Sequence, residues 1–221
     1  MEAFPSTFPA AAKVSYTGNP VRREIRELRN SASLTDASGR PLRLLVLGGS
    51  LGSEALNSIL PELIVSTPSG SIQTLHQTGP RQFAQTLQRY QQLGQDTEKT
   101  HRVVAFIDEM GEAYQWADIV LCRSGASTVC ELAVAAKPAI FVPYPYHKDR
   151  QQLRNANWLH AAGAAEVVEQ HELDVDRLMQ VLARLLNDLG RLREMGLSAS
   201  KVAICDAHTR IADLCLEAAY G

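Results

Sequence analysis

Hydrophobic residues in this chain form short apolar runs that alternate with stretches of helical spacing from residue 42 onward. Apolar runs bounded by glycine predict strands buried on both faces of a sheet. The predicted strands are Leu42–Leu47, Ser71–Gln77, Arg102–Ile107, Asp118–Cys122, Pro138–Pro143 and Ala165–Glu169. Because a helical stretch follows each one, we expect a six-stranded, doubly wound parallel sheet, an α/β fold of Rossmann-like topology.

The same pattern divides the chain into four segments. Residues 1–29 carry prolines at positions 5, 9 and 20 and a helical stretch at 21–29, and they do not look like the beginning of a domain. Residues 30–41 (NSASLTDASGRP) are polar and predict a linker. Residues 42–198 form the predicted sheet domain. Residues 199–221 form a C-terminal helix, the end of helical spacing that covers Val175–Leu189 and Arg191–Ala219.

Composition narrows the classes of function. The formal net charge of -2 gives nucleic-acid binding no electrostatic support. The four cysteines form no CxxC pair and have no histidine cluster beside them, so we expect neither a zinc site nor a disulfide framework. A run of about 18 apolar residues and a signal-peptide layout are both missing from the sequence, so we expect no membrane span or secretion signal.

A glycine-rich loop, Gly48–Ser53 (GGSLGS), follows the first predicted strand. Ligands of such sheets bind beyond the carboxyl ends of the strands. Glycine lets the backbone approach a ligand closely, and free amides at a helix start suit a diphosphate. Ser50 adds a hydroxyl donor. The loop is not a clean GxGxxG and no acidic residue ends the second strand, which disfavours a dinucleotide cofactor. A tight turn without a ligand is the alternative.

A second polar loop, RSGASTVCE (123–131), follows the fourth strand. Arg123 beside a glycine-rich turn favours a phosphate, because arginine binds oxyanions with two parallel hydrogen bonds. Glu131, expected in the first turn of the next helix, offers a carboxylate that can accept both hydroxyls of a ribose. The alternative is structural: Thr128-x-x-Glu131 matches a capping box, which needs no ligand.

Two weaker candidates follow other strands. In HKDRQQ (147–152), Gln151 and Gln152 offer uncharged groups for sugar hydroxyls; the alternative is a solvated helix start with Asp149 as its cap. At FIDEM (106–110), apolar residues with free backbone groups suit a flat base, and an ordinary strand end with an aspartate N-cap is the alternative. The DxD pattern at 174–176 is interpreted as helix capping, and Trp116 and Trp158 as packing residues.

These loops together resemble the MurG family, undecaprenyldiphospho-muramoylpentapeptide β-N-acetylglucosaminyltransferases. The matching stretches are TGNPVR (17–22), LVLGGSLGSEALN (45–57), FIDEMGEAYQWADIVLCRSGASTVCELA (106–133), PAIFVPYPYHKDRQQ (138–152) and NANWLHAAGAAEVVEQ (155–170). The combination of RSGA…TVxE with HKDRQQ is far more specific than any single motif. The resemblance is to the C-terminal half of the family, which is one lobe of a GT-B glycosyltransferase.

The resemblance implies a site for UDP-N-acetylglucosamine. Ser50 and Arg123 would face the diphosphate, the backbone of Ile107 would hold the uracil, and Glu131 would bind the ribose hydroxyls. The remaining substrate-binding residues implied in this way are Arg22, near the hinge, and Ala126, Ser127, Thr128, Gln151 and Gln152, along the phosphate and sugar. Leu51 and Ser127 stand where the family often has Gln and Leu, so contacts there are expected to differ.

The resemblance also implies a reaction. The whole enzyme would transfer N-acetylglucosamine to lipid I, giving lipid II for peptidoglycan synthesis, at the cytoplasmic face of the inner membrane and without a metal or other cofactor. The acceptor-side base would belong to an N-terminal lobe, of which residues 1–29 would be the tail. This chain alone would bind the donor and turn over little or nothing.

Two other functions stay open at this point. A chain of this kind would also serve as a separate donor-binding subunit that pairs with a membrane acceptor subunit. A UDP-N-acetylglucosamine 2-epimerase shares the fold, but it needs acidic and histidine groups at the sugar, which the uncharged Gln151–Gln152 pair does not supply.

Overall fold

A six-stranded parallel sheet forms the centre of the molecule in the computed structural model, which describes residues 14–31, 39–147 and 149–220. The strands lie in the order β3-β2-β1-β4-β5-β6. They are β1 (Leu42–Leu47), β2 (Ile72–Gln77), β3 (His101–Val104), β4 (Ile119–Cys122), β5 (Ala139–Phe141) and β6 (Ala165–Val167). The predicted doubly wound α/β sheet is therefore confirmed, with strands a few residues shorter at some ends.

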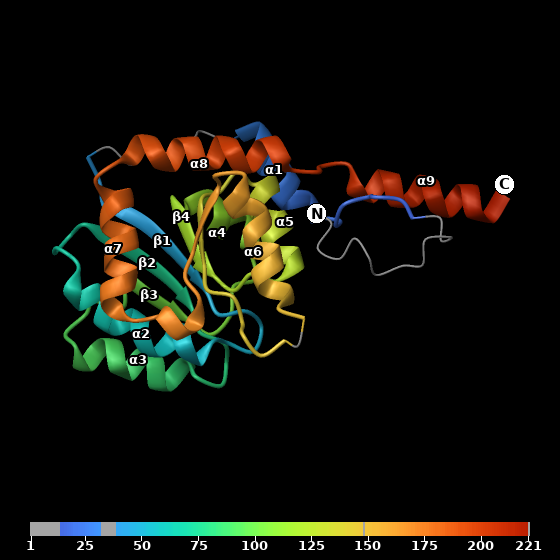
Figure 1. Cartoon of the computed structure of the whole chain (residues 1–221). Helices are drawn as coiled ribbons and strands as arrows, with labels where there is room; N and C mark the ends of the chain where they lie inside the picture. The colour runs from blue at the N-terminus through green and yellow to red at the C-terminus, as the bar shows by residue number, and fades with distance from the viewer. Residues whose placement is uncertain (1–13, 32–38, 148, 221) are drawn as a thin grey trace.

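Helices cover both faces of the sheet, as Figure 1 shows. They are α1 (Arg23–Ser31), α2 (Glu54–Ser66), α3 (Phe83–Gln92), α4 (Met110–Trp116), α5 (Ala126–Val134), α6 (Gln151–Ala161), α7 (Val175–Leu186), α8 (Leu189–Val202) and α9 (Ala207–Tyr220), with a 3-10 turn, η1, at Gln170–Glu172. Among the described residues, none of these helices is both long and apolar enough to cross a bilayer.

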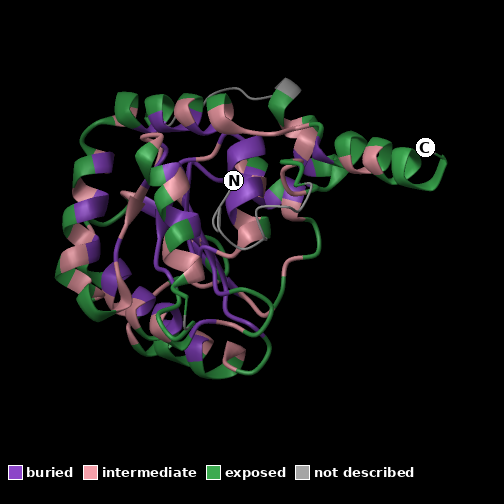
Figure 2. Ribbon diagram, turned by 45° about the vertical axis from the view of Figure 1, so that its right-hand side comes forward, coloured by how far each residue is buried: buried purple, intermediate pink, exposed green. Residues whose placement is uncertain are grey.

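Alternate residues of each strand serve two separate cores. Leu45 and Val120 pack with α1, α4, α5 and α6 on one face of the sheet. Leu44 and Leu121 pack with α2 and α7 on the other face. Successive side chains of a strand point to opposite faces, so a strand covered on both faces is mostly apolar, which explains the nearly continuous apolar runs at β1, β4 and β5. Figure 2 shows the resulting concentration of buried residues on the strands and inner helix faces.

The segment before the linker packs on this domain. Val21 and Ile25 are buried in the same core as α5, and α1 contacts α4 and α5. Val21 and Ile25 therefore share a core with the sheet domain, and the assignment of residues 1–29 as the tail of another lobe stays a prediction. Residues 1–13 of that tail and 32–38 of the linker lie outside the described part of the chain.

The C-terminal helix differs from its prediction. The expected helix Arg191–Ala219 is interrupted between Val202, where α8 ends, and Ala207, where α9 begins. Ala203 is extended, and the next residue, Ile204, contacts Gly18, where a Cβ atom would lie 2.8 Å from Ile204 Cγ2. This tertiary contact overrides local helical spacing. α9 then projects from the body with almost every residue exposed (Figure 1, Figure 2).

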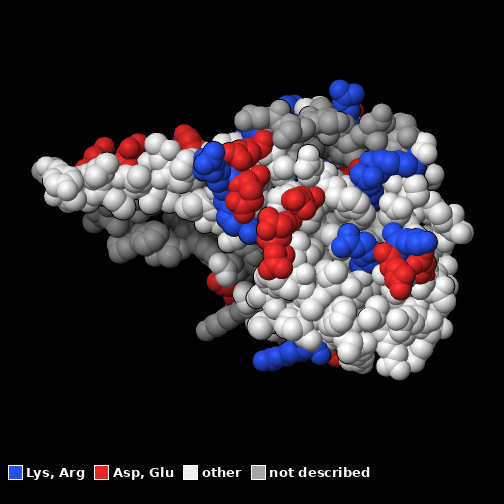
Figure 3. All heavy atoms as spheres, turned by 180° about the vertical axis from the view of Figure 1, so that it is seen from behind, with Lys and Arg blue, Asp and Glu red and all other residues white. Residues whose placement is uncertain are grey.

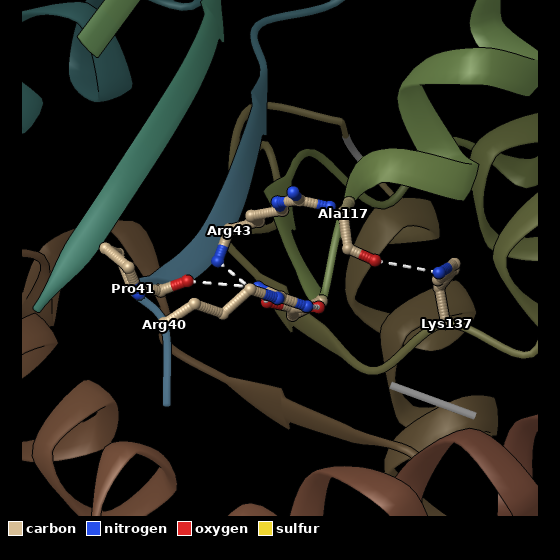
Figure 4. A network of polar contacts seen from close by, with 6 residues as sticks. Arg40, Pro41, Arg43, Ala117 and Lys137 are labelled. Atoms are coloured by element: carbon tan, nitrogen blue, oxygen red, sulfur yellow. Dashed lines mark hydrogen bonds and ion pairs between the residues drawn. The ribbon is translucent and has the colours of Figure 1, made fainter. Parts of the chain in front are cut away.

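A polar network fixes the amino ends of the two central strands (Figure 4). The buried Asp118 carboxylate accepts hydrogen bonds from Arg40 Nη1 at 2.6 Å, from Arg40 Nη2 at 2.8 Å and from the backbone N–H of Arg43 at 2.9 Å. Lys137 Nζ donates to the carbonyl of Ala117 at 2.7 Å, and burial lowers the pKa of this lysine to about 8. These contacts hold β1 and β4 in register at the edge opposite the predicted ligand loops.

Candidate functional site

One cleft, about 970 Å³ in volume, opens at the carboxyl ends of the strands. The chain order reverses between β1 and β4, and ligands of open α/β sheets bind at such a point. Of the residues predicted from the sequence, seven line this cleft: Arg22, Ser50, Ile107, Arg123, Thr128, Glu131 and Gln152. Ser50, Arg123 and Glu131, on which the interpretation depended most, thus share one face of the molecule.

The glycine-rich loop runs directly from β1 into α2 along one wall of the cleft. Gly52 has φ +84, and a Cβ atom there would lie 2.1 Å from the carbonyl oxygen of Thr78. Only glycine allows this approach between the loops after β1 and β2. Ser53 is the N-cap of α2, so the free amides of the following turn and the positive end of the helix dipole lie at the cleft.

A carboxylate from α5 forms the opposite wall. Glu131 Oε2 accepts a hydrogen bond from Tyr114 OH at 2.9 Å, and Glu131 Oε1 lies 3.6 Å from Arg22 Nη2. The Glu131 side chain is 16% exposed. Burial, with the charge of Glu131 next, raises the pKa of Tyr114 well above its ordinary value, so its hydroxyl keeps its proton. Burial and Glu131 likewise raise the pKa of Cys122 beside them, which keeps this thiol neutral.

The position of Glu131 in its helix corrects the sequence interpretation. Gly125 is the N-cap of α5, and no side chain caps this helix. Glu131 is therefore in the second turn of α5 and not in the first, and Thr128 forms no capping box with it. The capping-box alternative is thereby excluded, and the carboxylate contacts Tyr114 and Arg22.

Arg123 lies at the end of β4 with much of its guanidinium already engaged. Its Nη1 donates to the carbonyl of Val142 at 3.0 Å, and its Nη2 donates to Gln170 Oε1 at 2.7 Å. The guanidinium carbon lies 5.7 Å from the centre of the Tyr144 ring. Burial lowers the pKa of Arg123 from its ordinary, very high value, which leaves the group charged. Arg123 thus organises the loop after β5 as well as lining the cleft.

Gln152 plays a similar bridging role. Its Oε1 accepts hydrogen bonds from the backbone N–H groups of Ser124 at 3.2 Å and Tyr144 at 3.0 Å. This amide joins the loops after β4 and β5. Its neighbour Gln151 does not line the cleft, and neither do Ala126 and Ser127. Those three residues are at the first turns of α6 and α5, and a role for them in ligand binding stays a prediction.

The other capping expectations have mixed outcomes. Asp174 caps α7 by accepting from the N–H of Arg177 at 2.7 Å, so the DxD pattern is a helix start, as predicted. Asp108 is not the N-cap of α4, because Glu109 occupies that position. Arg150, in the left-handed region with φ 52, is the N-cap of α6, while Asp149 Oδ1 accepts from the N–H of Gln151 at 3.2 Å.

Several residues that line the cleft were not predicted from the sequence. Tyr114 and Gln170 make the contacts described above, and Gln77 at the end of β2 donates from Nε2 to the carbonyls of Gly49 at 2.9 Å and Ala105 at 3.3 Å. Gln77 ends a predicted strand, so its place among the loops at the carboxyl ends of the sheet could have been predicted. The place of Tyr114 could not, because a tyrosine inside a helix predicts ordinary packing.

Charges of both signs are mixed on the surface. Figure 3 shows basic and acidic side chains next to each other over a largely uncharged face. Within the part of the chain that the structure describes, the four cysteines are free and no group of three or more His, Cys, Asp or Glu could hold a metal ion. The cleft presents backbone N–H groups at the start of a helix, side-chain hydroxyls, side-chain amides and the Arg22–Glu131 ion pair.

Comparison with known proteins identifies the domain. The model of the glycosyltransferase family 28 C-terminal domain matches residues 43–211. The transferase named UDP-N-acetylglucosamine–N-acetylmuramyl-(pentapeptide) pyrophosphoryl-undecaprenol N-acetylglucosamine transferase is 43% identical in Stutzerimonas stutzeri, over 100% of this chain and 60% of the relative. The enzyme of that name from Methylococcus capsulatus is also 43% identical, over 99% of this chain and 60% of its own length. The chain thus spans about 60% of the length of these relatives.

Solved structures agree with this match. MurG of Acinetobacter baumannii superposes with a TM-score of 0.76 at 34% identity, covering 97% of this chain and 59% of that one. A UDP-N-acetylglucosamine 2-epimerase of Neisseria meningitidis, with a TM-score of 0.57 at 11% identity over 87% of this chain and 48% of its own, shares the fold alone. This chain is therefore a MurG homologue that belongs to glycosyltransferase family 28 and has the fold of the C-terminal lobe of its GT-B enzymes.

Proposed function

We propose that this chain is the donor-binding half of a metal-independent, inverting transferase that moves N-acetylglucosamine from UDP-N-acetylglucosamine to lipid I and forms lipid II. The observation that carries the proposal is the cleft between the ends of β1 and β4, where the order of the strands reverses. It brings together Ser50, Arg123 and Glu131 from the loops and helices after β1 and β4. The similarity to transferases named for this reaction supports the choice of substrate.

The parts of the cleft suit the parts of the donor. The diphosphate would lie against the amides at the start of α2, with Ser50 and Arg123 nearby. The uracil would lie at the loop after β3, where Ile107 is half-buried and lines the cleft. The ribose would place its hydroxyls at Glu131. Developing negative charge on the leaving UDP would be stabilised by the same amides and by Arg123.

The acceptor side is proposed to lie outside this chain. A base from the N-terminal lobe would take the proton of the acceptor hydroxyl. Lipid I would reach that lobe at the cytoplasmic face of the membrane. The expected partners are therefore UDP-N-acetylglucosamine at the cleft and an acceptor lobe beside it.

A Glu131→Ala variant tests the donor assignment. Loss of the hydrogen bonds to a carboxylate should weaken UDP binding by about 1.5–3 kcal/mol, or roughly ten- to a hundredfold, as measured by calorimetry. Glu112→Ala, on the exposed side of α4, is the matched control and should bind like the wild type. Equal UDP affinity in the Glu131 variant rules out the ribose assignment, and no UDP binding by the wild type rules out the proposed function.

A further inference from the structure

Glu131 and its two partners come from three separate segments of the chain. Tyr114 comes from α4, Arg22 lies just before α1, and Glu131 itself belongs to α5. A second contact brings these elements together: a Cβ atom on Gly111, in the first turn of α4, would lie 3.3 Å from Glu24 Cγ. Glu24 Oε1 in turn lies 3.4 Å from Arg22 Nε. The carboxylate is therefore fixed by residues of α4 and of the segment before α1, and not by side chains of its own helix, α5.

The geometry distributes the partners of Glu131 evenly over its two oxygens. A carboxylate has about four lone-pair sites, two on each oxygen. The Tyr114 hydroxyl occupies one site on Oε2, and Arg22 faces Oε1. Among the described residues no further side chain is bonded to this carboxylate, so at least one site remains on each oxygen, which matches the two O–H donors of a vicinal diol.

The hydrogen bond from Tyr114 can run in only one direction. An ionised carboxylate has no proton to give, so the phenol must donate. Tyr114 is fully buried, and its hydroxyl therefore meets Glu131 without competition from bulk water. Without that hydroxyl, the carboxylate would be free to rotate towards Arg22 and to present one oxygen to the ligand in place of two.

We propose that Tyr114 is a positioning residue that orients the Glu131 carboxylate for recognition of both hydroxyls of a ribose, and so makes this cleft selective for ribonucleoside diphosphates over 2′-deoxyribonucleoside diphosphates. This inference rests on the proposed function and extends it to a fully buried tyrosine behind the carboxylate. Tyr114 acts only through Glu131.

The test is a double-mutant cycle on the full chain, with UDP and 2′-deoxy-UDP as ligands. Tyr114→Phe should weaken UDP by about three- to tenfold, and it should weaken 2′-deoxy-UDP less, so the preference for the ribose shrinks. On a Glu131→Ala background, Tyr114→Phe should cause no further loss, because the group that it orients is gone.

Tyr90→Phe is the matched control, since it removes another fully buried tyrosine hydroxyl, one in α3 that contacts His76 and not Glu131, so any effect on nucleotide binding should be the same for both ligands. It should leave the ratio of the two affinities at the wild-type value. An equal loss for both ligands in Tyr114→Phe, or a loss that adds to that of Glu131→Ala, shows a merely structural role and overturns the inference. A wild-type chain that binds neither nucleotide rejects the proposed function instead.

Discussion

His76 is a buried residue whose hydrogen bonds help to position one of the loops that line the cleft. Its Nε2 lies 3.0 Å from Asn57 Oδ1, and its Nδ1 lies 3.2 Å from Tyr90 OH. Asn57 Nδ2 donates to the carbonyl of Thr78 at 2.9 Å, so Asn57 Oδ1 is the atom that accepts from His76. This places the imidazole proton on Nε2 and leaves Nδ1 to accept from Tyr90. The ring is therefore neutral, and its network holds Thr78 against Gly52 of the glycine-rich loop.

The neutral state of His76 predicts an acid-sensitive fold. Burial lowers the pKa of His76 to about 3, while in the unfolded chain it titrates near its ordinary value of about 6.5. Between these values the unfolded state binds the extra proton. The contribution of His76 is therefore complete above pH 6.5 and is lost as the pH falls towards 3, by about 1.4 kcal/mol per unit. Urea unfolding of the wild type and His76→Gln between pH 6.5 and 5 measures this slope.

His76→Gln should flatten the dependence of unfolding free energy on pH over this window, whatever it does to stability at pH 7. Burial also lowers the pKa of His101, which adds a slope of the same sign to both proteins and cancels in their difference. His171→Gln, at an exposed position in η1, is the control and should keep the wild-type slope. Parallel pH profiles for His76→Gln and the wild type would show that His76 is not the source.

Connections between strand ends set the shape of the cleft at the scale of the elements. Gln77 is the last residue of β2, and its side-chain amide donates to loops on both sides, at Gly49 and Ala105. The first loop is the proposed diphosphate site, and the second leads to Ile107 at the proposed base site. The distance between these sites is thus fixed by one amide on the strand between them.

Replacing Gln77 with methionine should remove the hydrogen bonds to both loops while keeping the length of the side chain. Two carbonyls would lose a donor, so we expect a stability loss of about 1–2 kcal/mol and UDP binding weaker by roughly three- to tenfold, from denaturant unfolding and calorimetry. Gln73→Met, on the same strand but away from the cleft, is the matched control. If both variants bind UDP equally well, Gln77 does not set the spacing of the loops.

The elements also show what a sequence can predict. Strands β4 and β5 were predictable because their runs are covered on both faces and are apolar throughout, whereas β2 was predictable from the alternation of polar and apolar residues over Ser71–Gln77. The register of Glu131 in α5 was not, because the helix begins at Gly125 without a capping side chain, whereas Thr128-x-x-Glu131 imitates a capping box. The break between α8 and α9 was hidden for a related reason: it depends on Ile204 meeting Gly18, far away in the sequence. The role of Tyr114 could not be predicted, because it depends on the contact between α4 and Glu131 of α5.

At the scale of the whole molecule, the two edges of the sheet have separate tasks. At the amino edge, the Arg40–Asp118 pair and Lys137 fix the central strands (Figure 4). At the carboxyl edge, the same strands continue into the loops that line the cleft. The ion pair and hydrogen bonds at the amino ends hold the strands in place. The loops at the carboxyl ends can therefore determine ligand specificity while their starting points stay fixed.

We propose that the site offsets the charge of a diphosphate with protein groups alone. The helix amides at α2 and Arg123 supply positive potential, and the part of the chain that the structure describes contains no acidic cluster suited to a divalent cation. Calorimetry with UDP-N-acetylglucosamine in EDTA and in millimolar magnesium should therefore give dissociation constants within about twofold of each other. Manganese should behave like magnesium, because the described residues form no group of three or more His, Cys, Asp or Glu that would hold either ion. Binding that tightens tenfold or more with either cation would mean that the metal bridges donor and protein, and the assignment of charge neutralisation to Arg123 and the amides of α2 would then be wrong.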